Sequence, residues 1–121
     1  MKKNILIVED QEELALALSE ALESKGFVVR TAATAEDGVE MIHSEVPEVL
    51  LLDLTLPGMS GMELLKSLRN GEATKGLPVM ILSNMDNPED FKEAHQYDVV
   101  EYLVKSDWRL DDIINKIKHI S

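Results

Sequence analysis

Short runs of apolar residues alternate with longer stretches of helical periodicity along the whole chain. Five runs are rich in Val, Ile and Leu: Ile5–Val8, Phe27–Val29, Val49–Leu52, Val79–Leu82 and Tyr102–Val104. Four of the five are too apolar to have a solvent-exposed face, which is typical of strands in a parallel sheet that is covered on both sides. The runs therefore predict the strands of such a sheet.

The stretches between the runs predict five amphipathic helices with recognisable ends. The first has apolar residues from Leu14 to Leu22 and ends at Gly26, and the second begins at a Thr34 cap with Asp37 three residues later. The third has its apolar residues within Gly61–Asn70, and the fourth begins at an Asn87 cap before Pro88. The fifth has apolar residues from Leu110 to Ile117. A strand followed by a helix, five times over, predicts an α/β fold with right-handed crossovers. We expect a doubly wound, five-stranded parallel sheet of order 2-1-3-4-5.

The charge balance excludes several classes of partner. The 121 residues include 23 acidic and 12 basic ones, which gives a net charge of −11, and 45% are hydrophobic, enough for one packed core. Nucleic-acid binding and docking on an anionic membrane both need a basic face. The chain has no cysteine, which excludes disulfides, thiolate metal sites and a cysteine nucleophile. The first apolar run, Ile5–Val8, is too short for a signal peptide or a membrane span, so we expect a single cytoplasmic domain over residues 1–121.

Polar side chains follow four of the apolar runs directly: Glu9 and Asp10, Asp53, Ser83, and Lys105. In a sheet of order 2-1-3-4-5 these strand ends are neighbours, so the five side chains should converge at one edge. Three carboxylates about 5 Å apart repel by about 3 kcal/mol per pair, and one lysine is not enough to balance them. Oxygen donors favour a hard cation, Mg²⁺ first, with Mn²⁺ or Ca²⁺ as substitutes. A carboxylate nucleophile, a divalent cation, a hydroxyl and a lysine are the groups that phosphoryl transfer uses.

Three motifs together resemble the response-regulator receiver domain of two-component signalling. They are Glu9-Asp10, the segment Leu-Leu-Asp-Leu-Thr-Leu-Pro-Gly-Met-Ser-Gly at 51–61, and the pair Ser83 and Lys105. The resemblance extends from Ile5 to Ile117, and we expect the stand-alone type, in which no output domain follows the last helix. It implies a flavodoxin-like sandwich and a phosphorylation-dependent signalling switch rather than an enzyme.

The resemblance implies a phosphoacceptor and a metal site. Asp53 would accept a phosphoryl group from a sensor histidine kinase or a phosphotransfer protein. Glu9, Asp10, Asp53 and the backbone carbonyl of Thr55 would hold Mg²⁺, directly or through water.

It also implies how phosphorylation is detected. Ser83 and Lys105 would bind phosphoryl oxygens, and Tyr102 would be the aromatic switch whose ring turns inward when the serine hydroxyl moves. The fourth helix, fifth strand and fifth helix would then present the change to a downstream protein, which the sequence does not identify.

Three positions depart from the family's usual pattern. Ser106 follows the lysine where proline is usual, which predicts a different path or more freedom for the loop from Lys105 to Arg109. Asn84 stands where a small residue is usual and should narrow access to the phosphoryl group. Asp98 replaces a usual glycine and is predicted to adopt a left-handed conformation.

Three other functions fit the sequence less well. A flavin- or nucleotide-binding protein needs a phosphate-binding loop after the first strand, where this chain has the acidic segment 9–13. A binding module that has lost its chemistry would not keep all five polar groups. The main alternative, an aspartate-nucleophile, metal-dependent phosphatase, usually has a general acid two residues after the nucleophile, where this chain has Thr55.

Overall fold

The computed structural model of the protein describes residues 3–84 and 88–120, and strands and helices alternate along them. The elements are β1 (Asn4–Val8), α1 (Glu12–Ser24), β2 (Val28–Ala32), α2 (Ala35–Ser44), β3 (Val49–Leu52), α3 (Gly61–Asn70), β4 (Val79–Ser83), α4 (Pro88–His95), β5 (Glu101–Val104), a single 3₁₀ turn (Lys105–Asp107) and α5 (Leu110–Ile120). The five strands form one parallel sheet in the order β2-β1-β3-β4-β5. The predicted fold class and strand order are confirmed.

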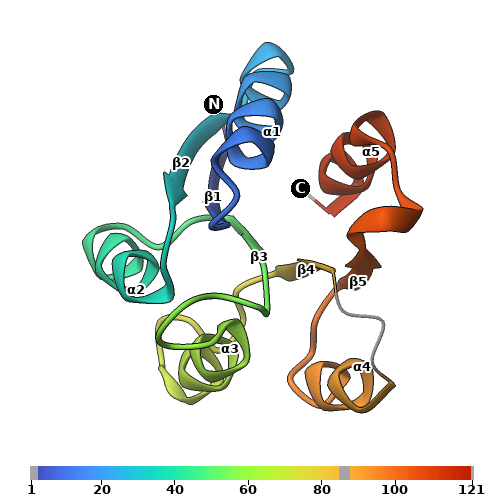
Figure 1. Ribbon diagram of the computed structural model, residues 1–121. Coiled ribbons are helices and arrows are strands. Elements are labelled where there is room, and N and C mark those ends of the chain that lie inside the picture. Colours follow the sequence, from blue (N-terminus) through green and yellow to red (C-terminus); the bar gives the residue numbers. More distant parts are fainter. Residues whose placement is uncertain (1–2, 85–87, 121) are drawn as a thin grey trace.

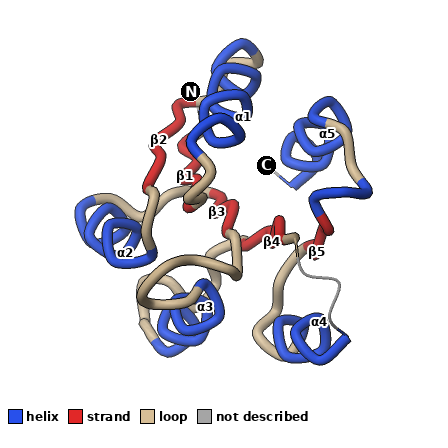
Figure 2. Tube along the Cα trace, viewed as in Figure 1, coloured by secondary structure: helices blue, strands red, loops and turns tan. Residues whose placement is uncertain are grey.

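The sheet separates two layers of helices, with α1 and α5 on one face and α2, α3 and α4 on the other (Figures 1 and 2). Successive residues of a strand point to opposite faces. In β1, Ile5 and Ile7 therefore pack in the core beneath α1 and α5, whereas Leu6 and Val8 pack in the core beneath α2 and α3. This double burial explains why the central strands are continuously apolar in sequence.

The two edge strands are more exposed than the sequence suggested. β1, β3 and β4 are buried almost throughout, but Val28 of β2 is 42% exposed, and β5 is half-buried at three of its four residues. The expectation that four of the runs have no exposed face is therefore wrong: three have none. An edge strand has a neighbour on one side only, so apolar residues there are incompletely covered.

Two predicted helix ends are confirmed. The Thr34 hydroxyl accepts a hydrogen bond from the backbone N–H of Asp37 at 3.1 Å, which caps α2. Gly26 follows α1 in the left-handed region, with φ +96°. The predicted cap at Asn87 lies outside the described residues.

Arg69, near the end of α3, ties that helix to the segment between α4 and β5. Its Nε donates to the carbonyl oxygen of Tyr97 at 2.6 Å, and one terminal nitrogen donates to that of Asp98 at 3.4 Å. Asp98 has φ +58°, so its predicted left-handed conformation is confirmed. Among the residues described, no helix combines the length and the apolar character that crossing a membrane requires.

Candidate functional site

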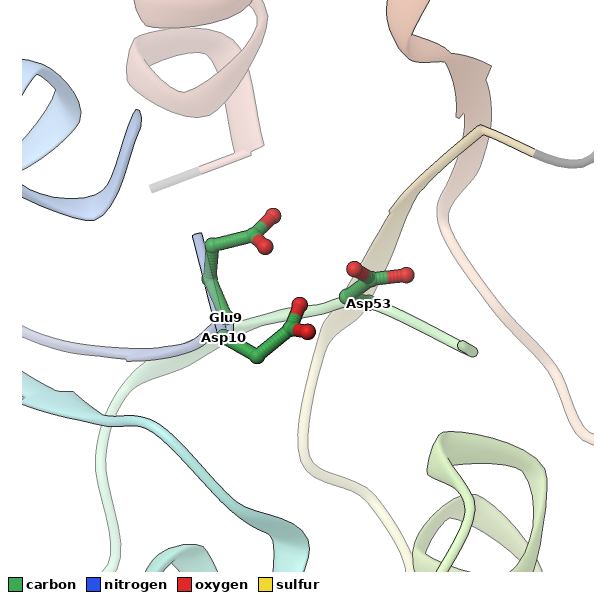
Figure 3. Close-up of side chains that lie close together, drawn as sticks. All are labelled: Glu9, Asp10 and Asp53. Atoms are coloured by element: carbon green, nitrogen blue, oxygen red, sulfur yellow. The ribbon is translucent and has the colours of Figure 1, made fainter. Parts of the chain in front are cut away.

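The pairing of β1 with β3 brings the three carboxylates together. Val8 lies opposite Leu52 in the register, and the backbone N–H of Asp53 donates to the carbonyl oxygen of Val8 at 3.0 Å. The next residues of each strand, Glu9 and Asp53, therefore leave the sheet side by side. One carboxylate oxygen from each of Glu9, Asp10 and Asp53 lies within 4.8 Å of the others (Figure 3).

Lys105 brings a positive charge into this cluster from the end of β5. Its Nζ lies 2.7 Å from Oε1 of Glu9 and 3.1 Å from Oδ2 of Asp53. The ammonium also donates to Oε1 of the Gln11 side chain at 2.9 Å. An ammonium has three N–H donors, so these three acceptors match its capacity. The predicted convergence of Glu9, Asp10, Asp53 and Lys105 is present in the structure.

Backbone amides hold the two buried carboxylates in place. Glu9 and Asp53 are only 4% and 3% exposed, whereas Asp10 lies on the exposed rim. The backbone N–H of Gln11 donates to Oε2 of Glu9, and that of Thr55 donates to Oδ1 of Asp53, each at 2.9 Å. Both oxygens of each buried carboxylate therefore have a partner, which fixes the orientation of the group.

The electrostatics of the cluster favour an additional cation. Burial raises the pKa of the Glu9 carboxyl, although hydrogen bonds from Lys105 and Gln11 oppose the rise, and the charge of Asp53 adds to it. Burial also disfavours the charge of Lys105, but its contacts with Glu9 and Asp53 outweigh this, and the pKa of Lys105 is raised. At 4.8 Å two carboxylates still repel by about 3.5 kcal/mol at an effective dielectric of about 20. The all-oxygen donor set fits Mg²⁺ or Mn²⁺.

Gly61, the first residue of α3, touches the backbone of the phosphoacceptor candidate. A Cβ atom at this position would clash with the carbonyl oxygen of Asp53 and lie 2.6 Å from Cα of Leu54. The N–H of Gly61 donates to the carbonyl oxygen of Leu54 at 3.1 Å. The absence of a side chain at Gly61 therefore lets α3 begin directly against the backbone that carries Asp53.

Ser83 and Tyr102 lie on the neighbouring strands. Ser83 ends β4, is fully buried, and is in register with Val104, the residue before Lys105. Tyr102 of β5 is half-buried, and its ring meets that of Phe91 in α4 edge-on at 5.4 Å. Their placement is compatible with the roles that the sequence suggested, and those roles stay predictions.

An open groove of about 440 Å³ runs along the lysine side of the site. It is lined by Gln11, Glu13, Leu14, Asn84, Lys105 and Ser106. Asn84 is thus at the rim, where the sequence predicted that it would limit access. Ser106 lies in the 3₁₀ turn Lys105–Asp107, which leads from β5 toward α5.

The sequence did not predict the contact between Gln11 and Lys105. The sequence indicates Gln11 only as part of the acidic segment 9–13, which would repel phosphate. The one available signal was its place immediately before the first helix, where a short Ser, Thr, Asp or Asn is preferred as a cap.

Comparison with known proteins agrees with this architecture. Residues 5–118 match the family model described as the response regulator receiver domain. The chain is 32% identical to the cell cycle response regulator CtrA of Brucella ovis over 116 residues, which cover 96% of this chain and 49% of CtrA. The chain spans about half the length of the curated relatives it matches.

Solved structures of response regulators have the same fold. A CheY-like receiver domain protein from Methanospirillum hungatei superimposes with a TM-score of 0.90 at 28% identity, covering 98% of this chain and 93% of that one. The Mn²⁺-bound form of the response regulator Rcp1 superimposes with a TM-score of 0.84 at 25% identity, covering 98% of this chain and 91% of Rcp1.

The chain belongs to the response regulator receiver domain family. Receiver domains of this family are signalling switches of two-component systems.

Proposed function

We propose that residues 1–121 form one receiver unit that accepts a phosphoryl group on Asp53 from the phosphohistidine of a sensor kinase or of a phosphotransfer protein. The observation that carries the proposal is the position of Asp53. Its carboxylate is buried at the end of a central strand, within 3.1 Å of the Lys105 ammonium and in a cluster of carboxylate oxygens. An ion pair alone would not need three acidic groups.

In this proposal Glu9, Asp10, Asp53 and the carbonyl of Thr55 hold the divalent cation, with Mg²⁺ favoured and Mn²⁺ acceptable. When bound, the cation supplies positive charge against the phosphoryl oxygens. The donor chemistry of the cluster supports this assignment, as does the similarity to Rcp1, a response regulator described in a Mn²⁺-bound form.

The protein's own groups would prepare Asp53 for attack. The Thr55 N–H and the Lys105 ammonium hold one carboxylate oxygen each, so the group cannot rotate freely. A carboxylate oxygen forms the new bond to phosphorus while the bond between phosphorus and the histidine nitrogen breaks, and the electron pair stays on the imidazole. Lys105 and Ser83 then bind oxygens of the transferred group.

The signal would pass from the site to the face made of α4, β5 and α5. Phosphorylation adds charge and acceptor oxygens beside Ser83. Movement of Ser83 would leave room for Tyr102, whose ring already contacts Phe91 of α4. A packed interior holds discrete arrangements, so a small shift can move these elements together. The downstream target is a protein, and we propose the cytoplasm, where a kinase has ATP, as the compartment.

Mass measurement after incubation with acetyl phosphate and Mg²⁺ tests the proposal. The wild type should gain one phosphoryl group, Asp53→Ala should gain none, and Asp111→Ala, an exposed aspartate in the first turn of α5, should behave as wild type. No gain in the wild type, or equal gain in Asp53→Ala, would refute it. A stable phosphoprotein also argues against a phosphatase, which turns over, and Thr55 gives no general acid for that reaction.

A further inference from the structure

We propose that Gln11 is a positioning residue, which holds the Lys105 ammonium in its resting place and must release it when an anionic group is bound to Asp53. The inference rests on the proposed function of Asp53 as phosphoacceptor. The hydrogen bond between Gln11 and Lys105 must break before the ammonium can bind that anionic group, and breaking it costs free energy.

The side chain of Gln11 binds Lys105 and does not cap the helix. Gln11 is the N-cap residue of α1, yet its side chain makes no capping hydrogen bond to any described residue. It instead accepts from Nζ of Lys105, a residue 94 positions away in sequence. The backbone N–H of Gln11, which binds Glu9, does not depend on the side chain. A substitution at this position should therefore change the contact with Lys105 and leave the backbone contacts in place.

The ammonium has no donor to spare in the resting arrangement. Glu9, Asp53 and Gln11 accept its hydrogen bonds at 2.7, 3.1 and 2.9 Å. To bind an oxygen of a phosphoryl group, Lys105 must give up one of these partners. Gln11 is the neutral acceptor, so its hydrogen bond lacks the attraction between opposite charges that reinforces the ammonium's contacts with the two carboxylates of the resting site. Gln11 is therefore the partner that the lysine gives up first.

The surroundings of Gln11 allow this exchange. Gln11 and Lys105 line the open groove of about 440 Å³ together with Leu14 and Ser106. Water in the groove can replace a lost partner on either side. Releasing the Gln11 amide therefore leaves no buried polar group unsatisfied. The free-energy cost of breaking the hydrogen bond between Gln11 and Lys105 is thus modest.

Gln11→Met tests the proposal, with Gln96→Met as a matched control on an exposed glutamine beyond α4. The first readout is hydrogen exchange of the Lys105 ammonium in ¹⁵N NMR, measured in chelator. The second is the affinity for beryllofluoride, a phosphoryl mimic, in the presence of Mg²⁺. Loss of one hydrogen bond to the ammonium should speed exchange by about 3- to 10-fold and tighten beryllofluoride binding by about 3- to 10-fold. Gln96→Met should match the wild type.

Gln11→Glu separates positioning from a general loss of packing. It keeps an acceptor oxygen for the lysine, so ammonium exchange should be at least as slow as in the wild type. Unchanged exchange in Gln11→Met overturns the proposal, and so does faster exchange with unchanged beryllofluoride affinity. If the wild type itself binds no beryllofluoride, the proposed function fails, and the exchange rates in chelator still decide whether Gln11 holds the lysine.

Discussion

Lys105→Met should lower the free energy of unfolding, and divalent cations should restore part of the loss. In the structure the ammonium is the positive partner of two carboxylates that are almost completely buried, with N–O distances of 2.7 and 3.1 Å. Removing it leaves Glu9 and Asp53 close together, with Asp10 at the rim.

The expected size follows from these distances. At an effective dielectric of about 20 the two contacts correspond to about 6 and about 5 kcal/mol of Coulomb energy. Most of this is offset, because methionine avoids the desolvation of an ammonium and Glu9 can take up a proton. Breaking a buried pair by removing one partner typically costs about 3–5 kcal/mol, and the open groove beside the lysine reduces this. We expect a loss of about 2–4 kcal/mol in the free energy of unfolding.

Urea unfolding at neutral pH, in chelator and in millimolar Mg²⁺, measures the effect. Mg²⁺ should recover part of the loss, because a ligand that binds only the folded state stabilises it by mass action. Lys116→Met is the control: Lys116 pairs with Glu101 at 2.9 Å, but both side chains are about a third exposed. Its loss should be under about 1 kcal/mol and independent of Mg²⁺. The reasoning would be refuted if both variants lost the same free energy of unfolding, or if the loss in Lys105→Met were the same in chelator and in Mg²⁺.

The metal site, the Glu9 carboxyl and the backbone of Asp98 each have a predictable response to substitution. Millimolar Mg²⁺ should raise the wild-type melting temperature over that in chelator, and Asp53→Asn should reduce this shift; equal shifts would remove Asp53 from the metal site. The folded state raises the pKa of Glu9 above 4.5, so the folded chain binds this proton more tightly than the unfolded chain. The contribution of Glu9 to stability in chelator is therefore full below pH 4.5 and lost as the pH rises through the folded value; Glu9→Gln should flatten that part of the profile, and parallel profiles would contradict it. Asp98 has φ +58°, so Asp98→Val should lower the free energy of unfolding by about 1–2 kcal/mol while Asp98→Gly should not, as urea titration would show.

The fold and the charged centre of the site were predictable because they depend on order along the chain. Buried parallel strands are continuously apolar, and their carboxyl ends meet at one edge, so the residues after each run must converge. That reasoning brought Glu9, Asp10, Asp53 and Lys105 together, and the structure agrees.

Features that depend on one side chain's direction were not predictable. Gln11 has no periodic signal, and its contact with Lys105 spans 94 positions and depends on the conformations of two flexible chains. The number of fully covered strands was also overestimated: the predicted order 2-1-3-4-5 already puts β2 and β5 at the edges, but apolar content alone does not show how far each edge strand is exposed. The backbone amide of Thr55, which orients Asp53, left no trace in the sequence, since every residue except proline carries that donor.

Gly61 packs directly against the backbone of Asp53. The position of the Asp53 carboxylate therefore depends on how closely the start of α3 packs against the end of β3. Gly61 does not have a positive φ, so the need for glycine here is one of room and not of backbone conformation. Any side chain at this position must displace either the start of α3 or the strand end that carries Asp53. A designer who moves the reactive carboxylate onto another scaffold would therefore have to transplant the helix start with it, because loop residues alone do not determine where the carboxylate sits.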